Sequence, residues 1–259
     1  MKVSVLGATG YAGVELLRIL YNHPKAEVRH ITSESHTGET IASLFPHLRG
    51  RYDMMLESMK DIQAIGADSD FVFIGLPHGH AMKVGKALSD LPTRIIDLGA
   101  DYRFTDTSVY ETWYHVKHTH KDAPRVYGLA ELYRERIRDA KIIGNAGCFT
   151  TASILALAPL AKNHLVDMAS IVVDAKSGVS GAGRSAKQAN LLPELYDSFK
   201  AYGVATHRHT PEIEQAMTEL SGEACILSFT PHLVPMSRGI LATCYARLKE
   251  GVEPNMVDA

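Results

Sequence analysis

The sequence predicts an α/β protein of two domains, in which a doubly wound parallel sheet is followed by an α+β domain with a mixed or antiparallel sheet. Short apolar runs alternate with amphipathic segments over the first half of the chain, which is the pattern of β-α-β units. The first apolar run leads directly into a glycine-rich turn. Beyond residue 148 the apolar runs become longer and richer in β-formers. We therefore place one domain at residues 1–147 and the other at residues 148–259.

The elements of the first domain follow from apolar periodicity and from the turn residues between them. Apolar runs predict strands at residues 2–7, 26–33, 70–77, 93–100 and 140–145. Helical spacing of Val, Leu, Ile and Ala predicts helices at residues 11–23 and 80–90. Because crossovers separate the strands, we expect them to run parallel with helices on both faces of the sheet.

The second domain opens on an apolar helix at residues 148–164, followed by strand-rich segments. Those segments are 169–183, 198–205, 223–237 and 238–248, with helices around 191–197 and at 211–220. Strands that follow one another without regular helical crossovers favour a mixed or antiparallel sheet.

Composition excludes several function classes. The formal charge is −2, and the 27 lysines and arginines are scattered, so we expect no nucleic-acid partner. No apolar run approaches the roughly 20 residues that cross a bilayer, so we expect no membrane contact. The spacing of the three cysteines suits neither a zinc site nor a disulfide framework, which predicts no metal and a cytoplasmic location.

The turn after the first predicted strand carries Gly7, Gly10 and Gly13, a G-x-x-G-x-x-G pattern that leads into a helix. Glycines at such a turn let the backbone approach a pyrophosphate, and the helix start offers N–H groups to it. A plain strand-to-helix turn would also use glycine, but the position at the start of a β-α-β unit favours a Rossmann-type dinucleotide site.

The choice of dinucleotide stays open on the residues alone. Glu34 lies close to the spacing at which an acid holds the ribose of NAD. Its neighbours Ser33, Ser35 and Thr37 are hydroxyl donors for the 2′-phosphate of NADP.

Cys148 lies where a strand, a small-residue turn and a helix meet, so we expect it at a helix N-terminus. The positive end of a helix dipole favours thiolate over thiol, which predicts a nucleophile. Burial as a packing residue is the alternative, and we assign that role to Cys225 and Cys244, which lie inside apolar strand-like runs.

A histidine cluster precedes the helix predicted at residues 211–220. His207 and His209 are candidate proton shuttles for a thiol, because imidazole titrates near neutral pH. The alternative is a capping or surface role for either histidine.

Two further segments are candidate anion sites. Residues 174–184 join small-residue loops to Arg184, and successive N–H groups there suit a phosphate or carboxylate. Arg103, after another strand end, is the second candidate. A glycine-rich turn with a solvated arginine remains the alternative.

These residues resemble the N-acetyl-γ-glutamyl-phosphate reductases of the semialdehyde dehydrogenase superfamily. The matching stretches are GATGYAG, IGLPHG, IDLGADYRF, GNAGCFTT, DAKSGVSGAGR, HRHTPEI and FTPHLVPMSRG, in the expected order over nearly the whole chain. The resemblance implies that Cys148 attacks the acyl phosphate, that phosphate leaves and that NADPH reduces the thioester to the semialdehyde. It favours NADP over NAD and places His209 as the base, with His207 as the substitute.

The resemblance, together with the motifs above, gives the expected site residues. Those for the cofactor are Gly7, Thr9, Gly10, Tyr11, Ala12, Gly13, Ser33, Ser35, Pro77, Ser177 and Gly178. Those for the small acyl-phosphate substrate are Arg103, Asn145, Arg184, His207 and Glu212. A homo-oligomer, dimer or tetramer, is implied as well.

Two departures from the family pattern stand out. Ala146 and Thr150 replace the prolines that usually precede the Gly-Cys pair and often follow Cys-Phe or Cys-Tyr. Family members also run past this length, so the resemblance predicts a second domain truncated at its C-terminal end.

Three other functions compete with this one. Aspartate-semialdehyde dehydrogenase shares the chemistry but tends to have Asn before its cysteine and lacks HRHTPEI. A carrier-linked aminoadipate phosphate reductase needs a basic docking patch, which the sequence does not show. An NADP-sensing or scaffold protein would keep the fold without the reaction.

Overall fold

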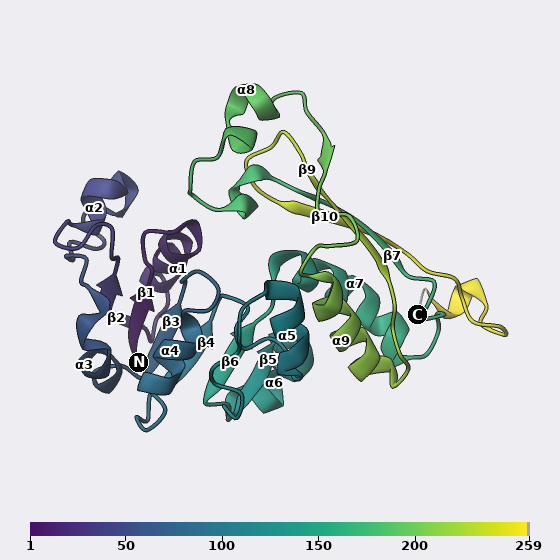
Figure 1. Ribbon diagram of the computed structural model, residues 1–259, viewed down its shortest axis with the longest axis horizontal. Coiled ribbons are helices and arrows are strands. Elements are labelled where there is room, and N and C mark those ends of the chain that lie inside the picture. Colours follow the sequence, from purple (N-terminus) through teal and green to yellow (C-terminus); the bar gives the residue numbers. More distant parts are fainter. Residues whose placement is uncertain (258–259) are drawn as a thin grey trace. The chain divides into compact units, whose positions relative to one another are not determined.

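The computed structural model describes residues 1–257 and divides the chain into two compact units, which part between Ala146 and Gly147 (Figure 1). Among the described residues, no helix has the length and apolarity that a membrane span needs. Each unit has its own sheet and is described by itself.

The first unit contains a six-stranded parallel sheet with strand order β2-β1-β3-β4-β6-β5. Its strands are β1 (Lys2–Leu6), β2 (Glu27–Thr32), β3 (Phe71–Ile74), β4 (Arg94–Asp97), β5 (Arg125–Gly128) and β6 (Ile142–Asn145). Its helices are α1 (Tyr11–Tyr21), α2 (Ile41–Leu44), α3 (Ile62–Ala67), α4 (Ala81–Ala87), α5 (Thr107–Tyr114) and α6 (Ala130–Arg138). The predicted doubly wound parallel sheet is confirmed.

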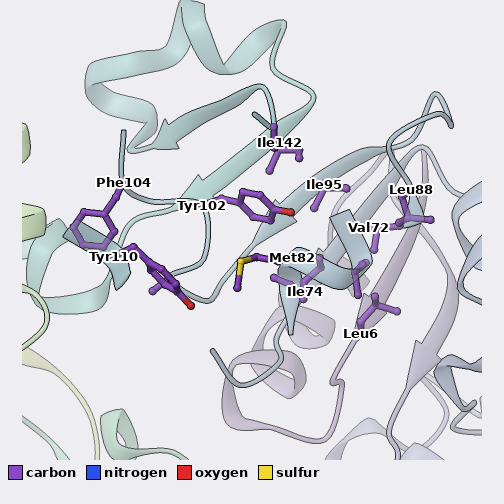
Figure 2. Packing of buried hydrophobic residues seen from close by; sticks show 14 of the residues in the cluster. Leu6, Val72, Ile74, Met82, Leu88, Ile95, Tyr102, Phe104, Tyr110 and Ile142 are labelled. Carbon is purple, nitrogen blue, oxygen red and sulfur yellow. The ribbon is translucent and has the colours of Figure 1, made fainter. Parts of the chain in front are cut away.

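Alternation along the strands builds a core on each face of this sheet. In β3, Val72 and Ile74 pack with α3 and α4, whereas Phe71 and Phe73 contact the cluster that holds α1. Figure 2 shows the first cluster, where Met82 of α4 lies among strand side chains and the aromatic rings that follow β4. Strands buried on both faces in this way read as continuous apolar runs in the sequence.

Strand order reverses at β1, which lies between β2 and β3. Open α/β sheets bind ligands at the carboxyl ends of the strands beside such a switch point. In this sheet, that edge carries the turn after β1 and the Gly75-Leu76-Pro77 segment after β3.

The second unit contains a four-stranded mixed sheet with strand order β10-β7-β9-β8. Its elements are α7 (Cys148–Lys162), β7 (Val172–Ser177), α8 (Leu192–Leu195), β8 (Lys200–Ala201), α9 (Thr210–Ser221), β9 (Ser228–Leu233) and β10 (Ile240–Tyr245). β7 pairs with β9 in parallel and with β10 antiparallel. The α+β prediction is confirmed, and the sheet is mixed rather than purely antiparallel.

The two faces of this sheet differ in burial. Val173 and Ala175 are fully buried, and α7 packs against α9 and β10 (Figure 1). The opposite face carries exposed apolar side chains at Leu241 (62%) and Tyr245 (58%), with Val172 opposite Tyr245 in register. A sheet face with large exposed apolar groups is a typical docking surface.

Some elements escaped the sequence prediction. β5 is four residues long and follows a proline, so its RVYG segment lacks a recognisable alternation. α6 is rich in charged residues, and α5 is rich in aromatic and β-branched residues, which helices do not favour. The strand predicted at residues 198–205 is reduced to the two residues of β8.

Candidate active site

The glycine turn after β1 is shaped by close backbone approaches. Gly7 has φ +82°, and a Cβ there would lie 2.5 Å from the Gly75 carbonyl oxygen. A Cβ on Gly13 would lie 2.6 Å from the Gly7 oxygen, which lets α1 pack tightly on the sheet. Gly10, the N-cap of α1, has only the Gly7 oxygen at 3.7 Å. Gly7 and Gly13 therefore permit close backbone packing, whereas Gly10 leaves open space at the start of α1.

A chain of hydroxyl groups runs from this turn to the end of β2. The Thr9 and Ser33 hydroxyls are 2.9 Å apart, and those of Ser33 and Ser35 are 3.4 Å apart. The Gly7 N–H donates to the Thr32 hydroxyl at 3.3 Å. Thr9, Ser33 and Ser35, which the sequence predicted as cofactor residues, are thus brought together beside the glycine turn.

Glu34 has a structural partner away from these hydroxyls. Its carboxylate accepts a hydrogen bond from the Met59 N–H at 2.8 Å, where a short 3-10 helix begins. Acids are favoured at such helix starts.

Tyr11, Ala12 and Pro77 are exposed residues on the same segments. Tyr11 and Ala12 open α1, and Pro77 follows β3. All three thus lie on the two segments that follow the switch-point strands, the edge that open α/β sheets offer to ligands.

Arg103 lies in a different environment from the one its motif predicts. It is only 6% exposed, and its guanidinium donates to the carbonyls of Asn145 at 2.8 Å and Leu98 at 3.1 Å. The Asn145 side chain donates to the Ala146 carbonyl at 3.2 Å. In these contacts Arg103 braces the backbone at the ends of β4 and β6.

Two buried carboxyl groups hold the DLGADYRF segment. Asp101 accepts hydrogen bonds from the Gly79 N–H at 2.8 Å and the Tyr110 hydroxyl at 2.7 Å. Asp97 accepts from the Gly99 N–H at 2.8 Å and is fully buried. Burial, reinforced by the nearby Asp101, raises the pKa of Asp97 to about 7.

Cys148 is the first residue of α7 and is exposed. Gly147 is the N-cap and has no side chain to compete for the helix N–H groups. A thiol at this position meets the positive end of the helix dipole, which favours its thiolate. By contrast, Cys225 is buried, and burial raises its pKa to about 12.

Glu212, in the first turn of α9, connects the starts of the two helices. It is fully buried and accepts hydrogen bonds from the Gly147 N–H and the Thr150 hydroxyl, both at 2.9 Å. The predicted residues Cys148 and Glu212 therefore belong to one local structure, although 64 residues separate them in the sequence.

His207 and His209 both pack on Phe149, the residue after the cysteine. The ring centroids lie 5.8 Å and 6.0 Å from that of Phe149, and 4.8 Å from each other. The His209 N–H donates to Nδ1 of His207 at 3.1 Å, so neutral His207 carries its proton on Nε2. Burial, with a contribution from Arg208, lowers the pKa of His207 to about 4.

Tyr202 is a site residue that sequence reasoning missed. Its ring lies 5.5 Å from His207, and its backbone N–H donates to the Pro231 carbonyl at 3.0 Å. Burial and electrostatic interaction with Cys148 raise the pKa of its phenol to about 12, so it remains a hydroxyl donor. The available signal was a lone tyrosine in an apolar run just before the histidine cluster.

Several backbone N–H groups between Ser177 and Arg184 already donate to backbone carbonyls. Gly178 donates to the Gly239 carbonyl and Ser180 to that of Ser237, each at 3.0 Å. A Cβ on Gly178 would lie 2.7 Å from the Arg238 nitrogen, so glycine permits this approach. The glycine-rich turn that the sequence left as an alternative thus accounts for these N–H groups. The Ser177 side chain is buried, and Arg184 is exposed.

Within residues 1–257, no group of three or more His, Cys, Asp or Glu side chains could hold a metal ion. What the second unit offers chemically is an exposed thiol, imidazoles and a phenol. The first unit offers a glycine turn at a switch point. This pairing of domains defines a class, the semialdehyde dehydrogenases, and family models agree with it. The model for "Semialdehyde dehydrogenase, NAD binding domain" matches residues 2–140, and that for "Semialdehyde dehydrogenase, dimerisation domain" matches residues 148–259.

Curated relatives narrow the class. N-acetyl-gamma-glutamyl-phosphate reductase from Geobacter metallireducens is 51% identical over 250 residues, which cover 96% of this chain and 72% of that protein. The protein of the same name from Pelotomaculum thermopropionicum is 49% identical over 250 residues, with the same coverage. The chain belongs to the N-acetyl-γ-glutamyl-phosphate reductase family, whose members are oxidoreductases of amino-acid biosynthesis.

Solved structures support the fold. Aspartate semialdehyde dehydrogenase with NADP from Candida albicans aligns with a TM-score of 0.69 and 15% identity, covering 99% of this chain and 74% of that one. Aspartate semialdehyde dehydrogenase II from Vibrio cholerae aligns with a TM-score of 0.71 and 16% identity, covering 99% and 77%. At this identity the likeness concerns the fold alone, so the rival assignment to that enzyme gains nothing from it.

Proposed function

We propose that the chain reduces N-acetyl-γ-glutamyl phosphate to N-acetylglutamate 5-semialdehyde, with NADPH as reductant and release of phosphate. The observation that carries the proposal is the placement of Cys148, an exposed thiol at the start of α7, beside Phe149, on which two imidazoles pack. A thiol nucleophile with a nearby proton acceptor is the arrangement that acyl transfer needs.

The thiolate sulfur of Cys148 attacks the acyl carbonyl carbon. A C–S bond forms, the C–O bond to phosphate breaks, and inorganic phosphate leaves with the electron pair. A reduced nicotinamide, when bound, would supply hydride to the carbonyl carbon of the thioester. The C–S bond breaks as the aldehyde C=O forms, and Cys148 is recovered as thiolate.

His209 is the proton acceptor in this proposal. His207 is a weak base, because its pKa lies near 4 and its Nδ1 already accepts from the His209 backbone. That bond leaves the Nε2–H of His207 as a donor to substrate oxygen. The Tyr202 hydroxyl is a second donor beside the thiol.

NADP is favoured over NAD by the partners of Glu34. Its carboxylate is bonded to the Met59 N–H, whereas the linked hydroxyls of Thr9, Ser33 and Ser35 lie beside the glycine turn. Hydroxyl groups donate to a 2′-phosphate, and the Met59 N–H already holds one oxygen of the Glu34 carboxylate. The open space over Gly10 fits the approach of a pyrophosphate.

The remaining substrate contacts divide into two kinds. We propose that Arg184, an exposed cation, attracts the anionic substrate. Arg103 and Glu212 shape the site through the backbone they bind, since both are buried in hydrogen bonds. Asn145, the last residue of β6, belongs to the same group, because its carbonyl accepts a hydrogen bond from Arg103.

The open face of the second sheet supports the proposal of a homo-oligomer. Leu241, Tyr245 and Val172 are exposed there, next to an ion pair between Lys176 and Asp174, 2.5 Å apart. The match to a dimerisation domain makes a second copy the natural occupant of this face. A thiol nucleophile needs a reducing environment, so we place the reaction in the cytoplasm.

The reaction is tested in reverse. Purified protein is given N-acetylglutamate 5-semialdehyde, phosphate and NADP, and NADPH is followed by its absorbance. Cys148→Ser should abolish the signal, while Cys244→Ser, a thiol on β10, should retain it. Arsenate should replace phosphate, because the acyl-enzyme accepts either anion. An inactive wild type, or an active Cys148→Ser, would refute the proposal.

A further inference from the structure

The first turn of α7 is capped by an acid from another helix. In an ordinary capping box, the third helical residue accepts a hydrogen bond from the N–H of the N-cap residue. Here the third residue is Thr150, whose short side chain does not play that part. Glu212 of α9 accepts the Gly147 N–H instead, at 2.9 Å. The capping interaction therefore joins two helices, α7 and α9.

The Thr150 hydroxyl has two acceptors within reach, the Glu212 carboxylate at 2.9 Å and the Gly147 carbonyl at 2.7 Å. The Gly147 carbonyl already receives the N–H and the hydroxyl of Thr151, each at 2.8 Å. A carbonyl oxygen has two lone pairs, so those two donors fill it. The single hydrogen of Thr150 is thus best used by Glu212.

The hydrogen bond between Thr150 and Glu212 matters energetically because neither side chain is in contact with solvent. Thr150 and Glu212 are each fully buried. A buried carboxylate needs donors to compensate its charge, and bonds to a charged acceptor are the strong ones. Proline, which the resembled family often has at this position, offers no such donor.

We propose that Thr150 is a positioning residue for Cys148, with its hydroxyl bridging Glu212 to the helix end that bears the thiol. The inference rests on the proposed role of Cys148 as nucleophile. Two effects follow from the bridge. It fixes the first turn of α7, and it compensates part of the Glu212 charge that would otherwise oppose a thiolate on the residue after Gly147.

Among the described residues, several polar and titratable groups lie near this helix end. Glu212 and His209 come from the start of α9, and His207 and Arg208 precede it. Tyr202 comes from the segment before them and interacts electrostatically with Cys148. Changes at Thr150 leave all five in place.

The test is alkylation of Cys148 by iodoacetamide, read by mass spectrometry from pH 5 to 10 without substrate or cofactor. Thr150→Val should move the midpoint of the rate profile upward by about half a pH unit, because the Glu212 charge is less compensated. Thr150→Ser, which keeps the hydroxyl, should restore the wild-type midpoint. Glu212→Gln should move it downward, because the opposing charge is gone.

The matched control is Ser153→Ala. This fully buried hydroxyl of the same helix donates to a backbone carbonyl, that of Phe149, at 2.8 Å. Its midpoint should equal that of wild type. In the reductase assay, Thr150→Val should lower kcat about tenfold with KM within about twofold, since the bridge acts on the covalent step.

An unmoved midpoint in Thr150→Val would overturn the inference, and so would Thr150→Ser matching Thr150→Val. If Thr150→Val does not fold, an unmoved or raised midpoint in Glu212→Gln overturns it. The proposed function fails separately, through an inactive wild type or an active Cys148→Ser, since alkylation needs no turnover.

Discussion

The backbone N–H of His209 donates a hydrogen bond to Nδ1 of His207, 3.1 Å away. The bond assigns different tasks to two histidines that the sequence could not separate. It fixes the tautomer of His207 and orients its Nε2–H as a donor. In the proposed mechanism, His209 is the residue that accepts the proton.

We expect His209→Asn to lower kcat by about 10²–10³-fold, the usual contribution of a general base. His207→Asn should lower it less and should keep the wild-type pH dependence between pH 5.5 and 8. The reason is that a pKa near 4 leaves His207 neutral throughout this range. Steady-state rates across that range make the comparison, and a changed profile in His207→Asn would reverse the assignment.

The glycine turn predicts that two similar substitutions fail in different ways. Gly13→Ala should destabilise the protein by about 3 kcal/mol, because its Cβ would meet the Gly7 oxygen at 2.6 Å. Gly10→Ala should cost about 1 kcal/mol or less, since its nearest neighbour is 3.7 Å away. It should nevertheless weaken NADPH binding about tenfold or more by blocking the pyrophosphate. Urea unfolding and NADPH fluorescence titration measure the two effects, and equal stabilities would contradict the argument.

Cofactor choice is tested at the hydroxyl chain. Ser35→Asp should weaken NADP binding at least about tenfold through like-charge repulsion with the 2′-phosphate, and should leave NAD binding nearly unchanged. Ser43→Asp adds the same charge to α2, where the serine hydroxyl only donates to the Thr40 carbonyl, and should affect neither. Calorimetric titration of both dinucleotides decides, and parallel losses in Ser35→Asp would argue against a 2′-phosphate contact.

Asp97 gives the stability of the first unit a pH dependence of predictable sign. Its folded pKa of about 7 lies well above the ordinary pKa of an aspartate carboxyl, 3.8. Between these values the folded state binds more protons than the unfolded state, so stability falls as pH rises from about 4 to 7. Asp97→Asn should remove this fall, which amounts to roughly 4 kcal/mol at most. Urea unfolding at each pH measures the difference between variant and wild type, and a constant difference would exclude the protonated carboxyl.

The exposed apolar face of the second sheet predicts a dimer that dissociates when a charged residue is introduced on that face. Leu241→Asp or Tyr245→Asp should shift the protein toward monomer, because each places a carboxylate on the exposed apolar face that the proposed dimer would bury. Ile19→Asp is the matched control, since Ile19 is 56% exposed on α1 of the first unit. Sedimentation equilibrium distinguishes the species. A dimer that survives both changes would place its interface elsewhere.

Most of the fold could be predicted from the sequence, because buried strands and long amphipathic helices produce a clear periodicity of apolar residues. The prediction failed where that signal is short or contrary, as in the four residues of β5 and the charged α6. Tertiary contacts decide such segments, and no local propensity reveals them.

The candidate site was predicted in part for a similar reason. We could predict Cys148, His207 and His209 from their residue types and from their positions at helix starts. Tyr202 could not be predicted, because a tyrosine in an apolar run reads as packing. The role of Thr150 depends on which acceptors surround its hydroxyl group, and only the three-dimensional structure shows them.

Three residues near the helix end that bears the thiol, Tyr202, Glu212 and Phe229, follow it in the chain, and the last of them lies in β9. A ribosome therefore releases Cys148 long before its partners exist, whereas the residues that form the first sheet are already complete. Domains generally fold in order of synthesis. The first sheet is therefore expected to form before the surroundings of Cys148 are complete.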